Sequence, residues 1–150
     1  MPEIKSALYQ LCLKFIEERI QTAETALQQA REASIDDTKS SAGDKYETSR
    51  EMMQQDIDRN KRLLIDAEEN QKVLNSIKDL PFTATARNGS LVYTSQGNFY
   101  LSISAGQLRL DKEAFFAISA VSPIGKLLLG KQKGDHFDFN GKKYSIKEVL

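Results

Sequence analysis

The chain has 150 residues, enough for one domain or two small ones. Its 21 Lys and Arg balance its 21 Asp and Glu, so the zero net charge excludes bulk attraction to nucleic acid or membrane. The charges are unevenly spread, because residues 1–80 carry 12 basic and 16 acidic side chains and residues 81–150 carry 9 and 5. This dipolar layout favours an oriented encounter with a charged partner.

Cysteine usage and hydropathy limit the cellular setting. The single cysteine, Cys12, excludes an intrachain disulfide, and its apolar neighbours predict an ordinary buried thiol. No basic-then-apolar leader opens the chain, and no run approaches the roughly 18 apolar residues that a membrane span needs. We therefore expect a cytoplasmic protein without membrane attachment.

Two stretches have the periodicity of long helices. The first carries an apolar seam formed by Ile4, Leu8, Leu11, Phe15, Ala23, Ala26, Ala30 and Ala33. The second, from about Thr48 to Lys78, carries a seam formed by Met53, Ile57, Leu64, Ala67, Leu74 and Ile77, with Asn60 and Gln71 at polar positions that help to set the register. Helices of about thirty residues would each be roughly 45 Å long. An antiparallel hairpin is the simplest packing, and a dimerising coiled coil or part of a bundle is the alternative.

A polar segment, residues 34–49, separates the two helical stretches and is expected to form the loop at the tip of the hairpin. Within it, Asp44 and Glu47 are three residues apart, so at a helix start they would share one side and could approach one metal ion together. The same pair fits a capping box, in which the aspartate caps the helix and the glutamate reaches back. Both interpretations stay open at this point.

After Asp79-Leu80-Pro81, which ends the second helix, the pattern changes to short strands. Runs rich in β-branched and aromatic residues predict strands at 91–94, 98–103, 107–110, 115–121, 136–139 and 143–149. Ser122 as N-cap and Pro123 predict a short helix that stops at Gly130. Asn140-Gly141 is typical of a tight hairpin turn.

The predicted fold class is therefore α+β with two domains. The first, residues 1–80, is an antiparallel helical hairpin of coiled-coil type with its tip near 34–49. The second, residues 81–150, is a small, mostly antiparallel β domain with one short helix.

The run from Ser122 to Lys131, SPIGKLLLGK, followed by Gly134-Asp135, resembles the C-terminal signature of the Gre-type bacterial transcript cleavage factors. The run Gly43-Asp44-x-x-Glu47 is similar to the G-D-x-x-E segment at the coiled-coil tip of that family. The resemblance covers the whole chain in order, and it implies an FKBP-like fold for residues 81–150.

The resemblance also implies a function. Gre factors bind RNA polymerase through the C-terminal domain and insert the coiled coil into the secondary channel. There the acidic tip helps to hold a second Mg²⁺, and the polymerase cleaves backtracked RNA with its own nuclease activity. The factor is not itself an enzyme, and it meets the RNA 3′ end, with DNA nearby, only through the complex.

For this chain the resemblance implies that Asp44 and Glu47 assist catalysis and share Mg²⁺ with the polymerase, with Asp36 and Asp37 as electrostatic helpers. No Mg²⁺ is expected on the free protein, which we expect to be a monomer. The resemblance implies a polymerase contact surface formed by Ser122, Pro123, Ile124, Gly125, Lys126 and Lys131.

Two other functions stay open. Lys45 and Thr48 stand where cleavage factors usually have leucine and asparagine, so the chain could be a Gre-like regulator that occupies the channel without promoting cleavage. A structural or adaptor coiled coil unrelated to transcription is the third hypothesis.

The sequence has no zinc cluster, phosphate loop or nucleophile motif. His136, the single histidine, is expected to be solvated or packed.

Overall fold

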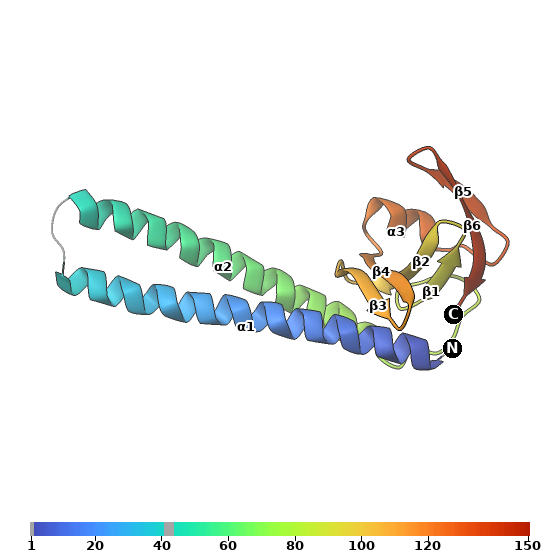
Figure 1. Ribbon diagram of the computed structural model, residues 1–150, viewed down its shortest axis with the longest axis horizontal. Coiled ribbons are helices and arrows are strands. Elements are labelled where there is room, and N and C mark those ends of the chain that lie inside the picture. The colour runs from blue at the N-terminus through green and yellow to red at the C-terminus, as the bar shows by residue number, and fades with distance from the viewer. Residues whose placement is uncertain (1, 41–43) are drawn as a thin grey trace. The chain divides into compact units, whose positions relative to one another are not determined.

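The computed structural model describes residues 2–40 and 44–150, with the side chains of residues 3–33 and 48–150. Two long helices come first, then six strands with one short helix between the fourth and fifth strands, so the α+β class is confirmed (Figure 1). The elements in chain order are α1 (Pro2–Ser40), α2 (Asp44–Ile77), β1 (Leu91–Thr94), β2 (Gly97–Ser102), β3 (Gly106–Leu110), β4 (Glu113–Ser119), α3 (Pro123–Leu128), β5 (His136–Phe139) and β6 (Lys142–Val149).

The chain divides into two compact units, and both long helices contribute to each of them. The first unit consists of the chain up to Phe15 together with Lys72–Leu150, and the second is Ile16–Gln71. This division differs from the predicted domains 1–80 and 81–150. The start of α1 and the last turns of α2 belong with the sheet because they supply part of the cover for one of its faces.

The helices are longer than predicted, because α1 has 39 residues and α2 has 34. α1 continues to Ser40 and α2 begins at Asp44, so helix occupies most of the segment 34–49 that was predicted to be a loop. Only residues 41–43 of that segment lie outside the described backbone. The prediction was wrong because Ser, Thr and Asp cost only a few tenths of a kcal/mol each in a helix, and extending an existing helix needs no new nucleus.

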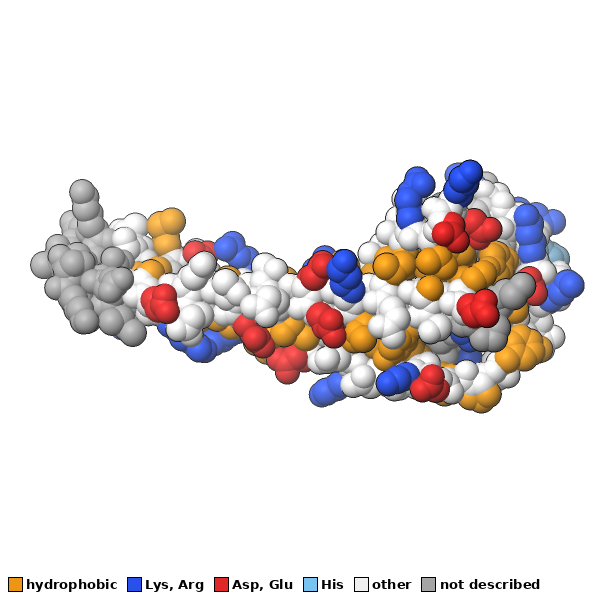
Figure 2. All heavy atoms as spheres, turned by 60° about the horizontal axis from the view of Figure 1, so that its bottom comes forward, with side chains coloured by type: hydrophobic (Ala, Val, Ile, Leu, Met, Phe, Trp, Pro, Cys, Tyr) orange, Lys and Arg blue, Asp and Glu red, His pale blue; other side chains and the backbone are white. Residues whose placement is uncertain are grey.

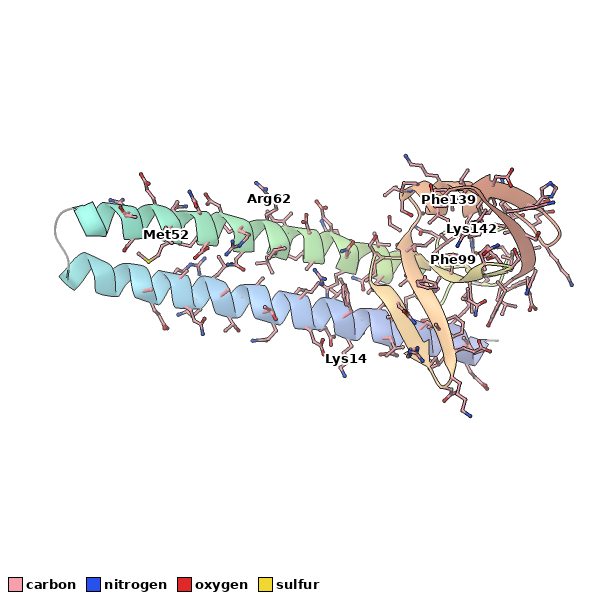
Figure 3. The ribbon with its side chains drawn as sticks, turned by 45° about the horizontal axis from the view of Figure 1, so that its top comes forward. Lys14, Met52, Arg62, Phe99, Phe139 and Lys142 are labelled. Carbon is pink, nitrogen blue, oxygen red and sulfur yellow. The ribbon has the colours of Figure 1, made fainter. Side chains whose placement is uncertain are left out.

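In the second unit α1 and α2 run antiparallel, side by side (Figures 1 and 3). Ala23 and Leu27 of α1 and Ala67 of α2 are buried, which confirms an apolar seam of small and branched residues. The visible face of this unit carries mixed acidic and basic side chains (Figure 2). A narrow buried stripe with charged residues around it is the pattern of a two-helix pair with most of its surface in water.

The predicted seam of α1 is only partly correct. Leu8 is buried as predicted, and the predicted burial of the Cys12 thiol is confirmed. Ile16 is also fully buried, whereas the seam residues Leu11 and Phe15 are only half-buried and Ala33 is exposed. The cause is that the first turns of α1 face the sheet as well as α2. One residue along a helix turns the face by about 100°, so a second contact surface shifts which side chains are covered.

The strands form one sheet in the order β3-β4-β2-β1-β6-β5. The β2–β4 pair is parallel and the other four pairs are antiparallel, so the predicted mostly antiparallel sheet is confirmed. β1 and β5 have the predicted bounds, β3 and β6 each begin one residue earlier than predicted, and β2 begins and ends one residue earlier. β4 begins and ends two residues earlier than predicted.

Alternation along the strands gives the sheet two covered faces. On one face Phe99 and Leu101 of β2 join a core that α3 covers with Leu128 and with the half-buried Ile124. On the other face Tyr100 and Ser102 are buried, and the Ser102 Oγ atom lies 3.7 Å from the Cys12 Sγ atom of α1. The sheet of the first unit therefore lies between α3 and the start of α1.

The β5–β6 hairpin closes as predicted. Asn140 and Gly141 connect the strands with φ values of 51° and 77°, the two successive positive φ values that a type I′ turn requires. Phe137 and Tyr144 are cross-strand partners, and their rings stack with centroids 5.1 Å apart. Such aromatic pairs stabilise a two-stranded ribbon by up to about 1 kcal/mol.

Candidate functional site

Four acidic positions lie at the end of the hairpin where α1 stops and α2 starts. Asp36 and Asp37 are in the last turns of α1, and Asp44 and Glu47 are in the first turn of α2. Helical backbone places Asp44 and Glu47 on one side of α2. Their side chains lie outside the described residues, and so do the predicted capping box and metal contacts. The backbone thus gathers four carboxylate-bearing positions at one end of the second unit.

The helix ends favour one pair of these residues and disfavour the other. The N-terminus of α2 carries partial positive charge, so Asp44 and Glu47 each stabilise it by roughly 0.3–1 kcal/mol. The C-terminus of α1 carries partial negative charge, which opposes the charge of Asp36 and Asp37. Helix stability therefore accounts for the pair in α2 but not for the pair in α1.

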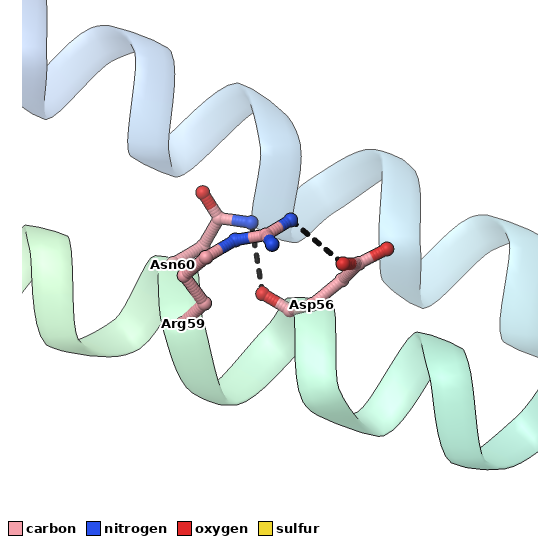
Figure 4. A network of polar contacts seen from close by, with 3 residues as sticks. All are labelled: Asp56, Arg59 and Asn60. Atoms are coloured by element: carbon pink, nitrogen blue, oxygen red, sulfur yellow. Dashed lines mark hydrogen bonds and ion pairs between the residues drawn. The ribbon is translucent and has the colours of Figure 1, made fainter.

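A polar network on α2 shows how the described part of the hairpin uses its charges (Figure 4). Arg59 forms an ion pair with Asp56 at 2.7 Å, but both side chains are more than half exposed, so the pair contributes at most about 1 kcal/mol. Asn60 is half-buried at its predicted seam position, and its side-chain amide donates to the Asp56 carbonyl oxygen at 2.9 Å. That bond lies within α2, so a role of Asn60 in helix register stays a prediction.

The Ser-Pro-Ile-Gly segment builds the start of α3. Ser122 is the N-cap, as predicted, and its Oγ atom accepts a hydrogen bond from the Gly125 amide at 3.1 Å. The same hydroxyl donates to the Ser119 carbonyl oxygen at 2.6 Å, which ties the helix to the end of β4. Pro123 occupies the first turn, where its missing N–H has no helical partner to lose.

Gly125 is required by a close approach between α3 and the end of β4. A Cβ atom at this position would lie far inside the van der Waals radius of the Ser119 carbonyl oxygen, 2.9 Å from the Ser122 Oγ atom and 3.0 Å from the Ala120 Cα atom. Two of these three neighbours are backbone atoms that cannot rotate away. The glycine in the motif is therefore explained by packing.

The residues from Gly130 to Asp135, the second part of the motif, also stabilise the fold. The Gly130 amide donates to the Ala86 carbonyl oxygen, and the Ala86 amide donates to the Lys131 carbonyl oxygen, both at 2.8 Å. The Asp135 carboxylate accepts from the Gln132 amide at 2.8 Å, and Gly134 has a φ of 93°. These bonds join the end of α3 to the connection before β1 and fix the turn into β5.

The predicted contact residues around α3 thus separate into two groups. Ser122 and Ile124 are half-buried and Gly125 is buried, so these three mainly support the fold. Pro123 and Lys126 are exposed, and Lys131 is half-buried. Two exposed hydrophobic residues adjoin the helix, Val121 at 76% exposure and Leu129 at 38%. The surface available to a partner is therefore formed by Val121, Pro123, Lys126 and Leu129, with the half-buried Lys131 beside it.

A cavity in the first unit was not predicted from the sequence. Its volume is about 460 Å³, and its walls come from the start of α1, the end of α2 with the connection that follows, β2 and Leu150. Its residues are far apart in the chain, so the only local signal is the four-residue spacing of Lys5 and Tyr9 along α1. Burial raises the pKa of the Tyr9 hydroxyl, and the nearby Asp79 carboxylate raises it further.

Tyr100, which lines this cavity, should make the protein sensitive to alkali. Its burial raises the pKa of the hydroxyl above the usual range, with Cys12 and Tyr9 adding to the rise. Because the pKa of Tyr100 is higher in the folded state than in the unfolded state, the neutral hydroxyl stabilises the folded protein. This contribution is complete below about pH 10 and is lost as the pH rises toward the folded-state pKa. Urea unfolding between pH 9 and 11.5 should show the unfolding free energy falling by up to about 1.4 kcal/mol per pH unit from this group above pH 10. Tyr100→Phe should lose that part of the slope, and equal slopes would contradict the assignment.

No three His, Cys, Asp or Glu side chains in the described part lie close enough together to hold a metal ion. His136 is exposed at the start of β5. Among the described helices, none is long and apolar enough to cross a bilayer.

Neither the protein-family models nor the curated proteins compared with this chain give a match.

Proposed function

We propose that this protein is a transcription elongation factor that binds RNA polymerase and acts through its secondary channel. The observation that carries the proposal is the helical hairpin with acidic positions at both helix ends, Asp36 and Asp37 in α1 and Asp44 and Glu47 in α2. A six-stranded sheet with one short helix follows it in the chain, and we propose that this domain has an FKBP-like arrangement.

Asp44 and Glu47 are the residues proposed to act on the backtracked transcript. Mg²⁺ prefers hard oxygen ligands and commonly takes one or two carboxylates beside waters and phosphates, so this pair suits an ion shared with the polymerase. Such an ion, when bound, stabilises charge on the attacking and leaving oxygens of the phosphodiester. Asp36 and Asp37 add negative charge at the same end of the hairpin. The polymerase performs the hydrolysis, and the factor completes its site.

The polymerase contact is assigned to the exposed residues around α3. Val121, Pro123 and Leu129 supply apolar surface, and Lys126 supplies a positive charge among them. A small apolar patch with a cation in it fits a partner surface that has an acidic side chain beside hydrophobic ones. Ser122, Ile124 and Gly125 serve this surface by holding α3 in place.

The proposal is tested on purified polymerase complexes stalled with a backtracked transcript in Mg²⁺ buffer. Addition of the protein should shorten the transcript from its 3′ end within seconds to minutes, while polymerase alone shortens it far more slowly. Binding is measured in parallel by fluorescence anisotropy of the labelled protein. Absence of polymerase association would contradict the proposal. The remaining hypothesis would then be a structural or adaptor coiled coil unrelated to transcription.

A second candidate function is favoured by Lys45 and Thr48, which directly follow Asp44 and Glu47 and carry a cation and a hydroxyl. A lysine next to Asp44 lowers the local negative charge that attracts a metal ion. On this candidate the protein occupies the channel and modulates or inhibits the polymerase. Tight binding with slower nucleotide addition, and no transcript shortening, would select it.

The contact surface makes a separate prediction about affinity. Reversing the charge at Lys126 and removing the apolar group at Val121, in the double variant Lys126→Glu/Val121→Ser, should weaken polymerase binding about tenfold. Both side chains are exposed, so the fold should be retained. Lys112→Glu, in the exposed turn between β3 and β4, is the matched control. Equal affinities for all three proteins would place the contact elsewhere.

A further inference from the structure

We infer that the cavity in the first unit is a binding site for a small uncharged molecule with an aromatic or alicyclic body and a carbonyl oxygen. Its volume of about 460 Å³ lies within the roughly 300–1,000 Å³ of typical ligand pockets. Its lining residue Tyr100 alternates along β2 with Phe99 and Leu101, which pack with α3. The cavity therefore lies on the sheet face opposite α3 and is separate from the proposed polymerase contact surface.

The hydroxyl of Tyr100 is the observation that points to a ligand. Tyr100 is only 2% exposed, yet within the described part of the chain its hydroxyl makes no hydrogen bond, since the Ser102 hydroxyl bonds its backbone carbonyl oxygen instead. Among the described residues, no side-chain oxygen is both enclosed by protein and without a partner. The hydroxyl therefore opens into the cavity that Tyr100 lines. A ligand oxygen at this point would gain the hydrogen bond that the protein leaves unmade.

A second phenol lines the same cavity. Tyr9 of α1 is half-buried, and its hydroxyl also has no hydrogen-bond partner among the described residues. Burial raises the pKa of both tyrosines, and each hydroxyl therefore keeps its proton at neutral pH. Two phenol donors without a protein acceptor favour a carbonyl oxygen, which has two lone pairs and no proton of its own.

The charges at the cavity favour an uncharged ligand. In the 150-residue chain the Lys5 ammonium donates to a carboxylate oxygen of Leu150 at 3.3 Å, so this cation has its counter-charge within the lining. Lys78 and Asp79, which also line the cavity, carry opposite charges. The charges of the lining are therefore balanced, and a charged ligand would lose hydration without gaining an unpaired counter-charge.

The apolar wall of the cavity would take the body of the ligand. Ile77 and Leu80 form part of this wall, together with Phe82 and the rings of the two tyrosines. Phe82 is 64% exposed, although it lines the cavity. A large aromatic ring that is open to water at a cavity wall gains from being covered by an apolar group.

The inference does not rest on the proposed function, because every lining residue belongs to the first unit and the test uses the 150-residue chain alone. The probes are the uncharged ketone 4-phenylbutan-2-one and the anion 4-phenylbutyrate, which have similar bodies and differ in charge. Titration is followed by amide ¹H–¹⁵N NMR shifts. With the ketone we expect saturable shifts at Lys5–Gln10, Ile77–Phe82 and Tyr100 and a Kd below about 5 mM. The anion should bind at least about tenfold more weakly.

Three variants make the test specific. Tyr100→Phe removes only the hydroxyl and should weaken ketone binding about fivefold. Tyr93→Phe, at a half-buried tyrosine of β1 outside the cavity lining, is the matched control and should leave the affinity unchanged. Phe82→Ala removes part of the apolar wall at an exposed position and should weaken the ketone about tenfold. Shifts centred on other residues, anion binding as tight as ketone binding, or a ketone affinity unchanged by Tyr100→Phe or by Phe82→Ala would overturn the inference.

Discussion

The double variant Asp44→Ala/Glu47→Ala is expected to stimulate transcript cleavage at least about 100-fold less than the unchanged protein, at saturating concentration. Replacing even a residue that only supports a metal ligand typically lowers metal affinity or activity 10- to 100-fold. Asp44 and Glu47 are proposed as ligands themselves, so the loss of activity should be at least as large. Neither residue belongs to the contact surface around α3, so polymerase affinity should be unchanged. The measurement is the rate of transcript shortening in stalled complexes over a range of Mg²⁺ concentrations.

A control pair with the same charge change is available on α2. Asp66 and Glu69, also three residues apart, are exposed in the described part of the helix, and Asp66→Ala/Glu69→Ala should cleave like the unchanged protein. If raised Mg²⁺ partly restores the Asp44→Ala single variant, a ligand role is supported. Full activity in the Asp44→Ala/Glu47→Ala protein would contradict a ligand role and leave helix capping as the function of the pair.

Gly125→Val is expected to have the largest effect on stability, lowering the free energy of unfolding of the first unit by about 3 kcal/mol. The added atoms would collide with the Ser119 carbonyl oxygen and crowd the Ala120 backbone, and neither can move without shifting the end of β4. Ser122 would also lose the geometry with which it bonds both Ser119 and Gly125. Urea unfolding followed by circular dichroism gives the change directly.

Two companion variants separate overpacking from loss of the cap. Ser122→Ala removes the cap but adds no volume, and it should cost about 1 kcal/mol. Lys126→Ala changes an exposed neighbour in α3 and should stay within about 0.5 kcal/mol of the unchanged protein. A Gly125→Val protein as stable as Lys126→Ala would show that α3 does not approach β4 as closely as described.

The β domain was largely predictable because its signals are local. Asn140-Gly141 predicted a tight turn, and both residues have the positive φ values that this turn needs. Ser122-Pro123 predicted a capped helix start, and the cap bonds are present. The parallel pairing of β2 with β4 had no such signal, since strand order depends on contacts between segments distant in sequence.

The errors arose where distant parts of the chain meet. Leu11 was predicted to lie in the buried seam of α1 but is only half-buried, because Ser102 and the rest of one sheet face cover the side of the helix that carries Cys12. No periodicity within α1 could reveal a contact 90 residues away. The cavity beside Lys5 was missed for the same reason. At the hairpin end, polar composition suggested a loop, although the helical backbone simply continues to Ser40.

The most direct test of the proposed function is a photo-crosslink from the hairpin end. Tyr46 lies between Asp44 and Glu47, and its replacement by p-benzoylphenylalanine puts a photoreactive group there. With backtracked polymerase, we predict an adduct to the catalytic subunit beside its active-site Mg²⁺ or to the RNA 3′ end. An adduct confined to the outer surface of the polymerase, or none while the same probe at Val121 reacts, would contradict insertion into the channel.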